Sequence, residues 1–150
     1  MANTIEQISI TFITDKSPII DIICNNLVVS GINILFRSEN IEDGLSQLSI
    51  LNEMPQVCII DLDFSDKNAL AQLHELKGKY PTLKLIAHSD DDSEQIVTTL
   101  LEIGIDGYLF IGTDAEELQT AVEGVCNDKK YFSTGVSKIA REYFSNKADA

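Results

Sequence analysis

Three acidic side chains follow segments of the chain that are rich in β-branched and apolar residues, namely Asp15, Asp61 and Asp63. Carboxylate oxygens are the hard ligands that Mg²⁺ prefers, and a carboxylate beside such an ion can also attack phosphorus. Asp61 is the strongest candidate, because it comes directly after the continuous apolar run at 57–60, which is typical of a strand buried on both faces. Three carboxylates at one place would repel one another unless a cation or a lysine lay among them. These residue types therefore indicate a magnesium site with a nucleophilic carboxylate.

Strand-like and helix-like segments alternate five times along the chain, and this alternation explains how distant acids could meet. The strand-like segments are 8–14, 32–36, 57–60, 83–88 and about 107–111. Each is followed by a segment whose apolar residues recur at helical spacing. Because β–α units in series require crossover connections, the sequence predicts an α/β fold with a five-stranded, doubly wound parallel sheet. Sites in such sheets form at the carboxyl ends of the strands, where the three aspartates would lie.

Composition and charge narrow the classes of function. The chain has 11 basic and 24 acidic residues, a net charge of −13, so we expect it to repel a nucleic acid rather than bind one. No apolar run approaches the roughly 18 residues of a membrane helix, so we do not expect a membrane-spanning protein. The first residues show neither the basic residue nor the apolar core of a signal peptide, so we do not expect secretion. The cysteines, Cys24, Cys58 and Cys126, lie in apolar runs, which predicts buried thiols in a reducing cytoplasm rather than a disulfide or a zinc site.

Three segments together resemble the receiver domain of bacterial response regulators, in the order in which that family carries them. Residues 55–62 look like the segment that ends in the phosphoacceptor aspartate, and residues 103–109 are similar to the family's G-A-D-G-Y-L run. Residues 130–133 resemble the stretch after the last helix of NarL-type receivers. The resemblance covers residues 7–133. It implies a flavodoxin-like sheet with strand order 2-1-3-4-5, and a two-component phosphorelay module that is not itself an enzyme.

The resemblance also implies a role for each residue of the predicted site. Asp61 matches the phosphoacceptor, and Asp15 matches one of two acidic residues that help to hold Mg²⁺. Asp63 lies where the family uses a backbone carbonyl for the metal. Ser89 matches the hydroxyl residue that turns toward the phosphoryl group, and Tyr108 matches the aromatic switch that moves inward with it. The chemistry implied is phosphoaspartate formation at Asp61 with Mg²⁺ as cofactor.

Two residues depart from the family pattern. Lys16 stands in place of the second acid, and Ile111 stands in place of the near-invariant lysine. Ile111 cannot neutralise a phosphoryl oxygen, so phosphotransfer should be weakened, since stabilising that charge is most of the catalysis. The Lys16 ammonium could reach the Asp61 carboxylate and stand in for the metal or for the missing lysine, in which case the domain signals without phosphorylation. Alternatively, Lys16 points into solvent and the three aspartates still bind Mg²⁺ weakly.

Residues 1–128 are expected to form the receiver-like domain, and residues 129–150 a C-terminal linker and helix with the output domain absent. Apolar residues at helical spacing predict an amphipathic helix at 134–146. Without an output domain, such a chain would act through protein contacts. The resemblance implies a histidine kinase or another signalling protein as partner, and a homodimer through the fourth helix, fifth strand and fifth helix or through the C-terminal helix. No membrane contact is expected.

One other family shares the acidic motif. Residues 61–65 look like the D-x-D-x-[TV] signature of haloacid-dehalogenase-type phosphatases, in which Asp61 would attack phosphorus and Asp63 would be the general acid and base. That signature normally lies on the first strand, whereas two β–α units precede it here. Of the two histidines, His74 is expected at an exposed helix edge. His88, immediately before Ser89, could line the site, but packing at a strand end is the favoured interpretation.

Overall fold

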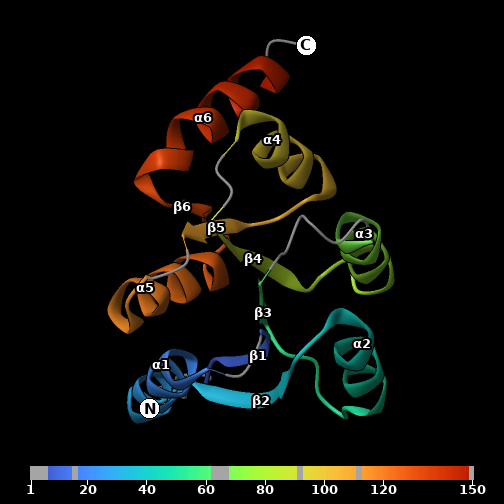
Figure 1. The fold of residues 1–150 in the computed structure, drawn as a ribbon, viewed down its shortest axis with the longest axis vertical. Coiled ribbons are helices and arrows are strands. Elements are labelled where there is room, and N and C mark those ends of the chain that lie inside the picture. Colours follow the sequence, from blue (N-terminus) through green and yellow to red (C-terminus); the bar gives the residue numbers. More distant parts are fainter. Residues whose placement is uncertain (1–6, 15–16, 62–67, 91–92, 111–112, 149–150) are drawn as a thin grey trace, which may run out of the picture.

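Six parallel strands form one sheet, in the order β2-β1-β3-β4-β5-β6 (Figure 1). The computed structural model describes residues 7–14, 17–61, 68–90, 93–110 and 113–148. The strands are β1 Ser9–Ile13, β2 Asn33–Ser38, β3 Val57–Asp61, β4 Lys84–Ser89, β5 Gly107–Phe110 and β6 Tyr131–Phe132. The helices are α1 Pro18–Val29, α2 Ile41–Ile50, α3 Ala69–Lys79, α4 Glu94–Ile103, α5 Ala115–Cys126 and α6 Thr134–Ala148.

The predicted doubly wound parallel sheet and its order 2-1-3-4-5 are confirmed, with one strand more than the five predicted. The additional strand is β6, which pairs in parallel with β5. Its ends are fixed by backbone hydrogen bonds from Tyr131 N–H to the Asp106 carbonyl and from Ser133 N–H to the Tyr108 carbonyl, at 3.2 and 2.9 Å. A strand of two residues has no detectable alternation of its own, so tertiary pairing defines it.

Two layers of helices cover the two faces of the sheet. Helices α1 and α5 lie together on one face, and α2, α3 and α4 lie on the other (Figure 1). Each face has its own buried apolar cluster, and β3 contributes alternate residues to both: Val57 and Ile59 to one cluster, Cys58 and Ile60 to the other. The continuous apolar run of β3 is therefore explained by burial on both faces. Its first polar residue, Asp61, is the last residue of the strand and lies at the carboxyl end of the sheet.

Polar side chains define where several helices begin. Ser17 Oγ accepts a hydrogen bond from Ile20 N–H at 3.2 Å, and Pro18 occupies the first helical position of α1. Asn40 and Asp114 cap α2 and α5 in the same way, each accepting from the N–H three residues later at 2.8 Å. These caps satisfy helix N–H groups that have no acceptor within the helix. They fix the points at which the chain turns from the carboxyl edge of the sheet back into a helix.

The predicted C-terminal amphipathic helix is present as α6, and it packs against α4 and β6. Val136 and Ala140 are almost completely buried there, in the same apolar cluster as Tyr108 of β5. Figure 1 shows α6 lying beside α4 beyond the β5–β6 end of the sheet. The predicted boundary at residue 128 stays a prediction.

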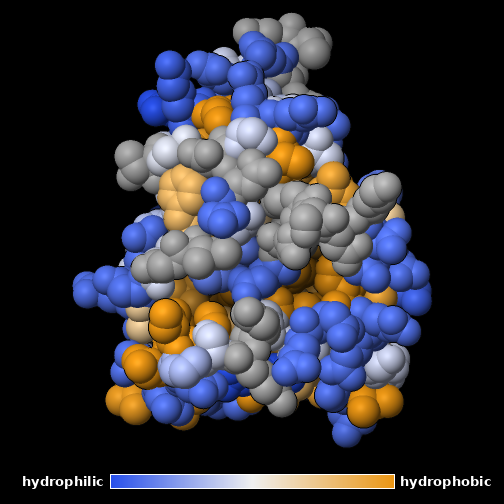
Figure 2. Space-filling view, viewed as in Figure 1, coloured by the Kyte–Doolittle hydropathy of each residue, from blue (hydrophilic) through white to orange (hydrophobic). Residues whose placement is uncertain are grey.

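Helix α1 carries apolar residues on its outer face as well as its inner face. Ile19, Ile22, Val28 and Val29 are each more than half exposed. Figure 2 shows hydrophobic side chains at the surface in the lower left, where Figure 1 places α1. A surface helix usually has polar residues on that side. None of the helices in the described ranges is long and apolar enough to cross a membrane.

The buried thiol of Cys58 in β3 gives a first test of the core. Burial raises the pKa of this thiol to about 12. Because only the thiolate is nucleophilic, we expect iodoacetamide to leave Cys58 unmodified in the folded protein while it labels the partly exposed Cys126. Raising the pH from about 8 to about 10 should not change this, since the thiol stays protonated until the pH approaches its raised pKa. Peptide mass spectrometry reads the sites, and denatured protein should be labelled at all three cysteines. Equal labelling of Cys58 and Cys126 in folded protein would contradict the prediction.

Candidate functional site

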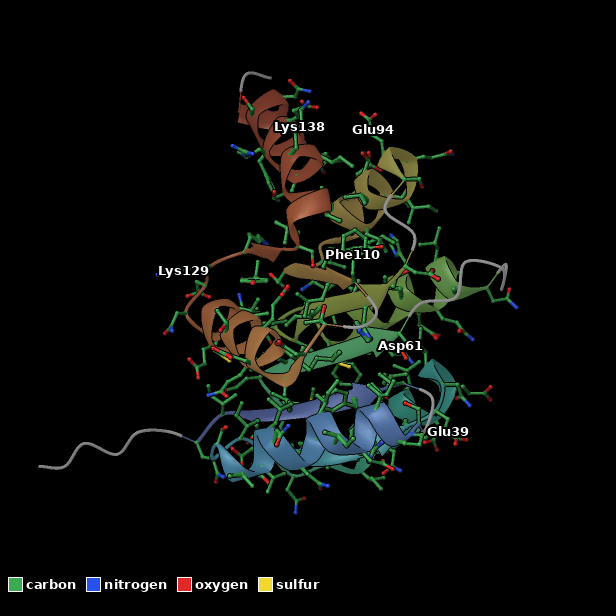
Figure 3. All side chains as sticks on the ribbon, turned by 60° about the vertical axis from the view of Figure 1, so that its left-hand side comes forward. Glu39, Asp61, Glu94, Phe110, Lys129 and Lys138 are labelled. Atoms are coloured by element: carbon green, nitrogen blue, oxygen red, sulfur yellow. The ribbon has the colours of Figure 1, made fainter. Side chains whose placement is uncertain are left out.

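Asp61 lies at the carboxyl edge of the sheet, as predicted. It is the last residue of β3, and its side chain is 24% exposed. Figure 3 shows Asp61 at the same edge as Glu39, which follows β2, while Lys129, which precedes β6, lies at the opposite edge. Because all the strands are parallel, their carboxyl ends share this edge. A half-buried carboxylate at such a position can still reach a small phosphoryl donor from solvent.

Among the residues that the structure describes, His88 contacts Asp61. The two residues are paired across β3 and β4, and His88 Nδ1 lies 2.5 Å from Asp61 Oδ1. The imidazole is nearly buried, with 9% of the side chain exposed. A carboxylate only accepts hydrogen bonds, so the ring N–H donates to it. His88 is buried near the end of β4, as expected, and its ring also lies against Asp61, the alternative that the sequence had left open. The contact depends on the register of β3 and β4, which neither local sequence states.

Ser89 and Tyr108 lie on the two strands beyond Asp61. Ser89 ends β4 and is completely buried, and it is paired with Phe110 of β5. Tyr108 is also completely buried, and its ring meets the Phe110 ring edge-to-face, with centroids 6.0 Å apart. The structure thus places a hydroxyl residue and a buried aromatic on adjacent strands. Their roles as a switch stay predictions.

Four of the predicted site residues lie outside the residues that the structure describes. They are Asp15, Lys16, Asp63 and Ile111. Within the described ranges, no group of three or more His, Cys, Asp or Glu side chains could hold a metal ion. Asp61 offers one carboxylate of the kind that Mg²⁺ takes, but its Oδ1 is in contact with an imidazole nitrogen, which is not a Mg²⁺ ligand by preference. The described residues alone therefore do not make up a Mg²⁺ site.

Asp106, a buried carboxylate directly before β5, fixes the start of that strand. Its Oδ2 accepts from the Leu85 backbone N–H at 2.9 Å, and its Oδ1 accepts from Lys130 Nζ at 3.1 Å. Lys77 and Lys84 are also close enough to interact electrostatically with it. Burial lowers the pKa of Lys77, and the charge of Asp106 partly offsets this effect. Asp106 thus joins β4, β5 and the segment before β6, a role that sequence reasoning missed.

Comparisons with known proteins show which molecules this chain is similar to. No protein-family profile matches it. It is 30% identical over 104 residues to the transcriptional regulatory protein DegU of Brevibacillus brevis, which covers 68% of this chain and 44% of DegU. It is 30% identical over 101 residues to the nitrate/nitrite response regulator protein NarP of Escherichia coli, which covers 67% of this chain and 47% of NarP. The chain spans about half the length of the curated relatives that it matches.

Solved structures of low sequence identity share the fold. The isolated receiver domain of RcsB from Salmonella enterica serovar Typhimurium, in its apo form, has a TM-score of 0.76 at 18% identity. That alignment covers 90% of this chain and 99% of the RcsB domain. A structure of two RcsB dimers bound to two parallel DNAs has a TM-score of 0.75 at 20% identity, and covers 89% of this chain and 68% of that one. The haloacid-dehalogenase alternative is not supported, because the matched proteins are response regulators.

The exclusion of nucleic acid was wrong. RcsB, which shares the fold over 89% of this chain, is described bound to DNA. The prediction was wrong because it was based only on the net charge of this chain, −13. The acidic balance of one segment gives no information about the parts of a longer protein beyond it, and this chain spans only about half of its curated relatives. Net charge here therefore excludes no nucleic-acid function of such a protein.

Proposed function

Because this chain is a receiver domain of the kind found in the NarP and DegU response regulators of two-component systems, we propose that Asp61 is its phosphoacceptor and that phosphotransfer to it is slow. The observation that carries the proposal is the position of Asp61: a partly exposed carboxylate at the end of the central buried strand β3. In support, a receiver domain of RcsB with the same fold has been solved in the presence of the phosphomimetic BeF₃⁻, at a TM-score of 0.73 and 21% identity.

The chemistry is a displacement at phosphorus. A carboxylate oxygen of Asp61 attacks the phosphorus of a donor such as acetyl phosphate, the bond from phosphorus to the acetate oxygen breaks, and acetate leaves with the electron pair. Little other covalent chemistry is involved, so the rate depends on how well the charge on the phosphoryl oxygens is stabilised. Ile111 carries no charge where the family has lysine, which is why we expect slow transfer.

We also propose that this domain acts as a signalling module rather than as an enzyme with a substrate of its own. Receiver domains are generally modules of this kind, and they generally bind Mg²⁺ at the phosphorylation site. Asp15, Asp61 and the backbone carbonyl of Asp63 are the candidate ligands in this chain. A cytoplasmic location is part of the proposal, in keeping with the free cysteines of the described residues.

Intact-mass spectrometry after incubation with acetyl phosphate and Mg²⁺ tests the proposal. We expect a slow gain of one phosphoryl group, about 80 Da, in the unmodified sequence, and no gain in Asp61→Asn, which lacks the nucleophilic oxygen. A gain of the same size in Asp61→Asn, or no gain in folded protein with Asp61 intact, would overturn the assignment. Ile111→Lys is the matched variant for the rate: faster labelling supports weakened phosphotransfer, and an equal rate contradicts it.

A further inference from the structure

The contact between His88 and Asp61 is built into the sheet. Asp61 and His88 are cross-strand partners in the parallel register of β3 and β4, so their side chains leave the sheet side by side. Apart from Asp61 itself and Lys84, the residues of the two strands are buried, and the imidazole is 9% exposed. His88 Nδ1 lies within hydrogen-bond distance of Asp61 Oδ1, and the carboxylate oxygen is the acceptor. Such a contact comes from the packing of two central strands, and no long flexible side chain has to be ordered to form it.

This hydrogen bond has a chemical effect on the carboxylate. An N–H that points at Oδ1 stabilises the negative charge and occupies a lone pair that a metal ion or a phosphorus atom would otherwise approach. The partly buried Asp61 needs a partner of this kind, because an unpaired carboxylate is costly to remove from water. In the sequence, the usual lysine is replaced by Ile111, and Lys16 stands where the family has an acid. Within the described ranges, it is His88 Nδ1 that lies against Asp61 Oδ1.

We propose that His88 is a positioning residue that holds the Asp61 carboxylate through Oδ1, in place of the family's lysine, so that Mg²⁺ binds this carboxylate less tightly than it would without the imidazole. The inference rests on the proposed function only in taking Asp61 as the acceptor. Mg²⁺ binds through carboxylate oxygens and gives up its waters reluctantly, so it competes poorly with a pre-formed hydrogen bond. The contact between His88 and Asp61 is then a common cause of weak Mg²⁺ binding and of slow phosphotransfer.

The test compares Mg²⁺ affinity in three proteins by isothermal titration calorimetry. His88→Leu keeps an apolar side chain of similar bulk without a donor, and we expect it to bind Mg²⁺ about tenfold more tightly, as for the loss of one hydrogen bond to a charged group. His88→Asn keeps an N–H near the position of Nδ1, so it should stay within about threefold of the unmodified protein. Unchanged affinity in His88→Leu, or equal tightening in both variants, would overturn the role of the donor.

A second measurement does not depend on the folding of a His88 variant. The chain has two histidines, and His74 is exposed on α3, so it is an internal reference. Long-range ¹H–¹⁵N spectra of the imidazoles should show His88 with its proton on Nδ1, hydrogen-bonded to Asp61. In Asp61→Asn the ring signals of His88 should shift, whereas those of His74 should not. Unshifted His88 signals would contradict the contact itself.

The two proposals can fail separately. If folded protein gains no phosphoryl mass but His88→Leu binds Mg²⁺ more tightly, the phosphoacceptor assignment fails and the positioning role of His88 stands. If the unmodified protein is phosphorylated at Asp61 and the Mg²⁺ affinity of His88→Leu is unchanged, the role of His88 fails and the acceptor assignment stands. If both hold, His88→Leu should also be labelled by acetyl phosphate more quickly than the unmodified chain.

Discussion

Replacing Asp106 with alanine is expected to lower the free energy of unfolding by about 3 kcal/mol. The side chain is 9% exposed and accepts from Leu85 N–H and from Lys130 Nζ. Its removal leaves the Leu85 N–H without an acceptor in the interior of the sheet, and an unsatisfied buried donor costs the full desolvation of that group. It also leaves the positive charges of Lys77, Lys84 and Lys130 without the carboxylate that they surround.

Urea unfolding measures this loss, and two variants separate its causes. Asp106→Asn keeps an oxygen for Leu85 N–H but removes the charge, so we expect a loss of about 1 kcal/mol. Lys130→Met removes a partner that is itself 44% exposed, and should cost about 1 kcal/mol because solvent screens that pair. If Asp106→Ala unfolds at the same urea concentration as the unmodified protein, the carboxylate does not hold the sheet as described.

The element order and the central aspartate could be predicted because each depends on local pattern. The apolar run at 57–60 became β3, Val57–Asp61, and its alternate residues fill the two apolar clusters on either face of the sheet. Asp61 could be recognised because a charge directly after such a run has to lie at the edge of the sheet. Because five β–α units follow one another along the chain, few sheet topologies other than the doubly wound one were possible. The sixth strand could not be seen, because its two residues are ordered only by pairing with β5.

Partners of the site residues could not be predicted, because they depend on register between distant segments. His88 lies 27 residues from Asp61, and nothing in either local sequence states that the two are cross-strand neighbours. Asp106 lies between Ile105 and Gly107, where an acid resembles a solvated turn residue, but its bonds reach Leu85 and Lys130. Residue type thus indicated the nucleophile. The partners of Asp61 and of Asp106 could be identified only from the pairing of the strands in three dimensions.

Replacing Val136 with aspartate is expected to destabilise the whole domain by about 3 kcal/mol or more, because it places a carboxylate in an apolar cluster without a partner. Val136 of α6 is completely buried in the cluster that also contains Tyr108 and Leu100. The helix would have to detach from α4 to expose the new charge to water, and the buried ring of Tyr108 would lose part of its cover. Urea unfolding, followed by far-UV circular dichroism and by tyrosine fluorescence, measures the loss.

Ser145→Asp is the matched control, since it adds the same charge at an exposed position of the same helix and should change stability by less than about 0.5 kcal/mol.

A chain ended at residue 128 tests the predicted domain boundary directly. Val136 and Ala140 lie in the same cluster as the sheet residues, so removing β6 and α6 uncovers core that the shorter chain cannot otherwise bury. We therefore expect residues 1–128 alone to unfold at a lower urea concentration than residues 1–150. Equal stability of the two chains would instead mean that α6 only rests on a complete domain, and Val136→Asp should then detach the helix without unfolding the sheet.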